Sequence, residues 1–177
     1  MKKDYFGSYI DSNIFVQYAK KDHQLHNKSK EFIDDIVNKY SKCKKLKFFA
    51  SRFSGVEIAS ALRRKNSRKD AEAFLFKKEN LWKNVFLPLP PSPKEKFQID
   101  NFISELMEIA LKFGTDSGDT IQTHAIETYK DQIDYVITND KDFKKRLQKK
   151  YRKIKIFYLK EDFETICWLM KDILRKK

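Results

Sequence analysis

Short apolar runs alternate with segments of helical spacing along most of this 177-residue chain. LKFFA (46–50), DYVIT (134–138) and KIKIFYL (153–159) are typical of buried strands, and Tyr9-Ile10 belong to an earlier one. Such alternation favours a parallel sheet with helices on both faces. We therefore predict an α/β fold, a three-layer α/β/α sandwich with a central parallel sheet. The length suits a single domain over residues 1–177.

The helical segments are predicted from apolar spacing and from residues typical of helix ends. The amphipathic helices are expected over 28–40, 99–113 before Gly114, Ser117 to about Lys130, 141–150 after Asn139-Asp140, and a closing segment with Phe163, Ile166, Met170 and Ile173. Further helices are expected from Ser54 onward and over 68–83, and NVFLPL (84–89) is predicted to form a short strand.

Four acidic residues lie where strands give way to helices: Asp11, Glu57, Asp119 and Asp140. An unpaired carboxylate is costly in such apolar or turn-forming surroundings. Ligand sites in parallel sheets lie at the carboxyl ends of the strands, so these side chains are expected to converge there. A shared divalent cation, Mg²⁺ or Mn²⁺, would compensate their charge and could support phosphoryl-transfer chemistry.

Each acid also has a purely structural interpretation. Asp11 could be only a helix N-cap, and Glu57 only the capping-box partner of Ser54. Asp119 could merely interact favourably with the helix dipole, and Asp140 could be a turn residue. Nearby Asp116 and Asp142 are secondary candidates for metal contact, or loop residues. His124, alone on an apolar helix, is interpreted as a packed, hydrogen-bonded residue rather than a general base.

The net charge of +13 favours a polyanionic partner, most often nucleic acid. Because lysines are scattered along the whole chain, a merely solvated surface explains the charge equally well. The basic residues nearest the acids are the candidates for binding RNA phosphates: Arg52, Arg64, Lys141 and Lys144.

Cysteine and hydropathy patterns bear on the compartment. Cys43 and Cys167 show no metal-binding or redox spacing, which suits a reducing cytosol. The chain contains no apolar stretch of the ~20 residues needed to span a bilayer, and the N-terminal residues lack the apolar run of a signal peptide. A cytoplasmic protein without membrane contact is therefore expected.

Four segments in order, YIDSNIF, FSGVEIASAL, SGDTIQTHAIE and YVITNDKDF, resemble the four motifs of PIN-domain nucleases, with the VapC-like toxins as the nearest group. The resemblance covers nearly the whole chain. It matches Asp11 with Asn13, Glu57, Asp119 with His124, and Asp140 with Thr138. Thr120 stands where the third motif usually has alanine.

The resemblance implies a PIN-like fold and Mg²⁺- or Mn²⁺-dependent endoribonuclease activity. In this set Asp11, Glu57, Asp119 and Asp140 hold the metal, while Asn13 and Thr138 support the site. It also implies tRNA, rRNA or mRNA as substrate, frequent homodimers, and a cognate antitoxin protein. Two alternatives stay open: a housekeeping nuclease in RNA processing, and a non-catalytic nucleic-acid-binding module on the same scaffold.

Overall fold

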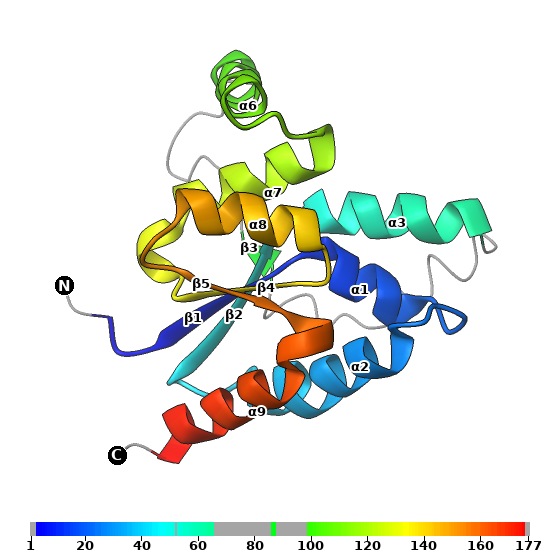
Figure 1. Ribbon diagram of the computed structural model, residues 1–177, viewed down its shortest axis with the longest axis vertical. Coiled ribbons are helices and arrows are strands. Elements are labelled where there is room, and N and C mark those ends of the chain that lie inside the picture. Colours follow the sequence, from blue (N-terminus) through cyan, green and yellow to red (C-terminus); the bar gives the residue numbers. More distant parts are fainter. Residues whose placement is uncertain (1–2, 52, 66–85, 88–98, 176–177) are drawn as a thin grey trace.

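A parallel sheet forms the centre of the molecule in the computed structural model, which describes residues 3–51, 53–65, 86–87 and 99–175 (Figure 1). The strand order is β3-β2-β1-β4-β5, and every neighbouring pair is parallel. The strands are β1 (Phe6–Ile10), β2 (Leu46–Ser51), β3 (Phe86–Leu87), β4 (Tyr135–Thr138) and β5 (Lys155–Tyr158). The predicted strands are thus confirmed, and the two residues of β3 lie within the predicted segment 84–89.

Helices connect the strands as the spacing predicted. They are α1 (Ser12–Ala19), α2 (His26–Glu31), a π-helix (Phe32–Asn38), α3 (Phe53–Lys65), α6 (Ile99–Phe113), α7 (Ser117–Thr128), a 3-10 helix (Lys130–Gln132), α8 (Lys141–Lys150) and α9 (Leu159–Arg175). The predicted helix over 68–83 lies outside the described residues. Gly114 follows α6 with a φ of 58°, the left-handed conformation expected of a glycine at a helix end.

The boundaries differ from the prediction in three places. The helix expected over 28–40 is α2 followed directly by the π-helix. Helix α3 includes Phe53, so Ser54 lies inside it instead of starting it. Helix α7 ends at Thr128 because the chain turns at Tyr129 into the 3-10 helix that leads to β4.

Alternate strand residues face opposite sides of the sheet and form two separate cores. On one side, Ile10 and Ile137 pack with α1, the π-helix, α3 and α9. On the other side, Tyr9 and Val136 pack with α7 and α8. Helices covering both faces confirm the three-layer α/β/α sandwich (Figure 1).

The carboxyl ends of the central strands meet at one edge of the sheet. Ile10 of β1 pairs with Ile137 of β4, and the Asp11 backbone N–H donates to the Ile137 carbonyl at 3.0 Å. Asp11 and Thr138 therefore leave the sheet side by side. Since β2 borders β1 on its other side and leads into α3, the start of α3 belongs to the same edge.

Helix α6 lies on the outside of α7. The Phe102 ring stacks on Phe53 of α3 with centroids 6.0 Å apart, and meets the His124 ring edge-on at 5.1 Å. Within the described parts of the chain, no helix has the length and apolar character needed to cross a membrane.

Candidate active site

Asp11 is the most deeply buried acid at the sheet edge, with 5% of its surface exposed. Burial raises its pKa from 3.8 to about 6, against the hydrogen bonds from Thr138 and Asn13. The negative charges of Glu57 and Asp140 raise the pKa of Asp11 further. Asp11 therefore lies within electrostatic reach of both Glu57 and Asp140.

Asn13, in the first turn of α1, and Thr138, at the end of β4, both bind the Asp11 carboxylate. Thr138 Oγ1 donates to Asp11 Oδ2 at 2.6 Å, and Asn13 Nδ2 donates to the same oxygen at 2.8 Å. Asn13 Oδ1 in turn accepts the Asn139 backbone N–H at 3.1 Å. Both residues were predicted to support the site, and the structure brings both into contact with Asp11.

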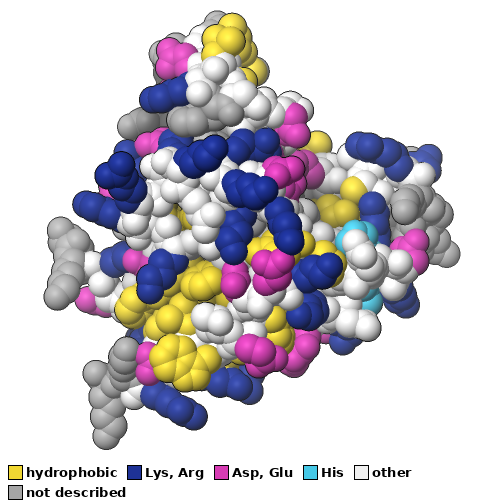
Figure 2. All heavy atoms as spheres, viewed as in Figure 1, with side chains coloured by type: hydrophobic (Ala, Val, Ile, Leu, Met, Phe, Trp, Pro, Cys, Tyr) yellow, Lys and Arg dark blue, Asp and Glu magenta, His cyan; other side chains and the backbone are white. Residues whose placement is uncertain are grey.

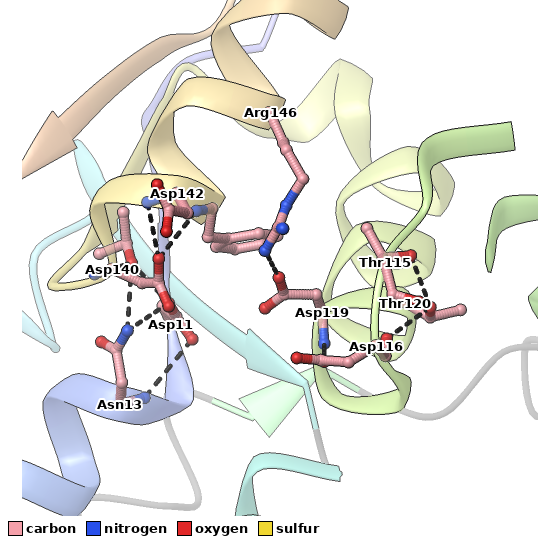
Figure 3. A network of polar contacts seen from close by, with 11 residues as sticks. Asp11, Asn13, Thr115, Asp116, Asp119, Thr120, Asp140, Asp142 and Arg146 are labelled. Atoms are coloured by element: carbon pink, nitrogen blue, oxygen red, sulfur yellow. Dashed lines mark hydrogen bonds and ion pairs between the residues drawn. The ribbon is translucent and has the colours of Figure 1, made fainter.

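Asp140 serves as the N-cap of α8 in this structure. Its Oδ1 accepts the backbone N–H groups of Asp142 and Phe143, both at 2.8 Å. Its own backbone N–H donates to Thr138 Oγ1 at 2.9 Å. Thr138 thus bonds to both the Asp11 side chain and the Asp140 backbone. Figure 3 shows these two predicted acids close to each other.

Glu57 enters the site from the second turn of α3. Its Oε2 accepts Gln122 Nε2 of α7 at 2.6 Å. The same Gln122 nitrogen reaches Ser54 Oγ at 3.3 Å, and Gln122 Oε1 accepts the Tyr9 hydroxyl. The Ser54–Glu57 capping interaction suggested by the sequence is therefore replaced by a shared bond to Gln122, because Ser54 lies within the helix.

The pKa of Tyr9 is affected by both Asp11 and Glu57. Burial raises its pKa well above 10.0, and the charges of Asp11 and Glu57 raise it further. The hydroxyl therefore stays protonated and remains a donor to Gln122. Tyr9 thereby links β1 to α7 next to the strand end that leads to Asp11.

Asp119 points from the first turn of α7 toward α8, where it forms an ion pair with Arg146 (Figure 3). Asp116 precedes it as the N-cap of α7, with Oδ1 accepting the Asp119 backbone N–H at 2.9 Å. Asp142 lies on the surface, and its side chain is 80% exposed. Of the two secondary candidates, Asp116 is thus a capping residue and Asp142 an exposed side chain near Lys145.

A ready-made metal cage is not present in this arrangement. Among residues 3–51, 53–65, 86–87 and 99–175, no group of three or more His, Cys, Asp or Glu side chains is gathered closely enough to hold an ion. The chemistry of the set nevertheless fits a hard cation, because the carboxylates of Asp11, Glu57 and Asp140 offer oxygen donors. Asp119 could bind the same ion only after its ion pair with Arg146 is broken.

The basic residues predicted to bind RNA have mixed surroundings. Lys141 pairs with Glu161 at 2.7 Å and Lys144 with Asp162 at 3.0 Å, so both link α8 to the first turn of α9. Arg64 is on α3 and donates to Ser60 at 3.1 Å. Arg52 lies outside the described residues. In Figure 2, Lys and Arg side chains gather where α8 crosses this face of the molecule.

Two residues that contact the predicted site residues, Gln122 and Tyr9, were not predicted from the sequence to belong to the site. Gln122 sits on a helix predicted for other reasons, and only its burial among Tyr9, Ser54 and Glu57 reveals its contacts. Arg146 also contributes to this region, through its ion pair with Asp119. His124 matches its prediction as a packed residue, since it is 5% exposed and its Nε2 lies 2.7 Å from Glu105.

Sequence comparison adds no relative to this description. No protein-family model matches the chain, and no curated protein is similar to it at a significant level.

Proposed function

We propose that this protein is a metal-dependent endoribonuclease of the PIN type, and that it acts as the toxin of a toxin–antitoxin pair. One observation carries the enzymatic part. Buried Asp11, with its pKa raised to about 6 chiefly by burial, lies at the carboxyl edge of a parallel sheet, within electrostatic reach of Glu57 and Asp140. A buried carboxylate with a strongly perturbed pKa at the ligand-binding edge of a parallel sheet is a candidate for a functional site.

Asp11, Glu57 and Asp140 are the side chains that would hold Mg²⁺ or Mn²⁺, with Asp119 as a further ligand. The ion, when bound, would activate water and stabilise the phosphate during in-line displacement. The protein contributes the orientation: Asn13 and Thr138 fix Asp11, and Thr138 also fixes the backbone of Asp140. The net charge of +13 supports a polyanionic substrate such as RNA.

The toxin role rests on the resemblance of YIDSNIF, FSGVEIASAL, SGDTIQTHAIE and YVITNDKDF to VapC-like toxins. Expression in a bacterial host is then expected to arrest growth, and the Asp11→Asn variant to be harmless at equal protein level. Growth that continues during expression of an RNA-cleaving wild-type protein would instead favour the housekeeping nuclease.

The direct test is cleavage of end-labelled RNA by the purified protein with and without Mn²⁺. We expect metal-dependent cleavage that Asp11→Asn and Asp119→Asn abolish, while circular dichroism shows an unchanged fold. Asp131→Asn is the matched control, because this exposed acid precedes β4 at the opposite end of the strand. Cleavage that survives in both site variants, or that ignores chelators, would disprove the proposal. Absence of both cleavage and Mn²⁺ binding would instead favour the non-catalytic module.

A further inference from the structure

Two residues of α7 border the Glu57 carboxylate: Gln122 binds it and Gly118 leaves space for it. Its Oε2 accepts Gln122 Nε2 at 2.6 Å. Its Oε1 faces the backbone of Gly118, where a Cβ atom would come to 2.8 Å from that oxygen. A glutamate side chain has several rotamers of similar energy. The bond to Gln122 favours the observed rotamer, and the absence of a side chain at Gly118 leaves space for it.

The orientation of the Gln122 amide follows from its neighbours. A carboxylate only accepts hydrogen bonds, so the amide nitrogen must face Glu57 and the amide oxygen must face Tyr9. The Tyr9 hydroxyl donates to that oxygen, and the nitrogen also reaches Ser54 at 3.3 Å. With 1% of its surface exposed, Gln122 has no route to exchange these partners for water.

Gly118 makes room for Glu57 in the first turn of α7. The nearest heavy atom to a Cβ at this position is Glu57 Oε1, and the next is Asp116 Oδ1 at 3.5 Å. The obstacle is thus the end of a flexible side chain, which can move at small cost. A methyl group at position 118 would therefore displace the Glu57 carboxylate without disturbing α7.

We propose that Gln122 and Gly118 are positioning residues that aim the Glu57 carboxylate at the metal site. Gln122 donates a hydrogen bond to Glu57, and the bond from Tyr9 fixes the orientation of the Gln122 amide. Gly118 contributes by leaving space for the carboxylate. This role rests on the proposed function, because Glu57 needs a fixed orientation only if it serves a ligand. Outer partners of metal-binding carboxylates commonly change metal affinity by about 10- to 100-fold.

The test compares Mn²⁺ binding, by electron paramagnetic resonance, among wild type, Gln122→Leu, Gly118→Ala and Gly55→Ala. We expect Gln122→Leu and Gly118→Ala to weaken Mn²⁺ binding by about tenfold. Gly118→Ala should do so with thermal stability equal to or above that of wild type, because alanine favours a helix over glycine. Gly55→Ala is the matched control, since a Cβ there meets nothing within 4 Å, and its Mn²⁺ affinity should not change.

A double-mutant cycle separates positioning from general structural damage. In a Glu57→Gln background, Gln122→Leu and Gly118→Ala should no longer change Mn²⁺ affinity, because the carboxylate they position is gone. Equal affinity of wild type and both single variants, with Asp11→Asn still impaired, would overturn the positioning role and leave the proposed function intact. Additive losses in the cycle would also overturn it. Absence of Mn²⁺ binding by wild type would overturn the proposed function itself, and the positioning role with it.

Discussion

Arg146 of α8 donates to Asp119 of α7, 27 residues earlier in the chain, and so engages one of the four acids at the sheet edge. Asp119 is 17% exposed at its side chain and Arg146 is 36% exposed, so the pair is partly shielded from water. Within the described part of the chain, the buried Arg146 Nε has no hydrogen-bond partner. The guanidinium is thus held by Asp119 through one of its nitrogens, and it competes with any other cation for that carboxylate.

Removing this competitor should strengthen metal binding. Arg146→Met is expected to raise Mn²⁺ affinity about fivefold, which corresponds to the ~1 kcal/mol of a partly exposed ion pair. Isothermal titration calorimetry measures the change, with Lys145→Met as the control for lost positive charge on α8. Equal affinities of Arg146→Met and Lys145→Met would show that Asp119 is not a metal ligand.

Asp11 should make the metal-free protein less stable as pH rises. Its pKa is raised from 3.8 to about 6, so folding favours the protonated form, and stability present below 3.8 is lost by the time the pH exceeds 6. A shift of two units corresponds to about 3 kcal/mol in total, of which on the order of 1 kcal/mol is lost between about pH 5 and pH 7.5.

Urea unfolding at these two pH values checks this loss, with Asp11→Asn as the comparison. The wild type should lose more stability than the variant between them, and saturating Mn²⁺ should remove the difference, because a bound cation favours the ionised carboxylate. The titration of Glu127 does not contribute to the stability change between these two pH values. Burial raises its pKa, but bonds to Lys130, Tyr151 and Lys150 lower it to about 2, so its effect falls below pH 4.5. Parallel pH profiles of wild type and variant would contradict the prediction.

The two helix-capping acids should respond differently to serine, which also caps helices well. Asp116→Ser and Asp140→Ser are both expected to unfold within about 0.5 kcal/mol of wild type, since each keeps an acceptor at the N-cap. Asp140→Ser should nevertheless lose metal-dependent RNA cleavage, because it removes a charge beside Asp11. Asp116→Ser should retain cleavage; its loss would identify Asp116 as a ligand and not only a cap.

His124 is expected to matter for the attachment of α6. Its ring meets Phe102 at 5.1 Å and its Nε2 lies 2.7 Å from Glu105. His124→Ala should cost about 2 kcal/mol of unfolding free energy, because it leaves a cavity between α6 and α7. Hydrogen exchange should become faster in α6. Glu105→Ala is the control and should cost under about 0.5 kcal/mol, since an exposed partner contributes little.

Much of the candidate site could be predicted because its backbone setting is local. The run YVIT and the following Asn139-Asp140 predict a strand and a helix cap, and β4, α8 and the Asp140 cap confirm them. Ser54 and Glu57 show the limit of local spacing. Their separation suits a capping box, yet both side chains bind Gln122, more than 60 residues later, which no local pattern encodes.

The sequence by itself determined the order of strands and helices, the parallel sheet, and the sheet edge at which Asp11 and Asp140 lie, because periodicity and chain direction are local properties that the backbone must obey. Only the tertiary structure decided how each acid is used: Asp11 clamped by Asn13 and Thr138, and Asp119 turned to Arg146. The physical reason is that hydrogen bonds and charges act through space. Their strength depends on burial and on partners from distant segments, which the linear order of residues does not specify.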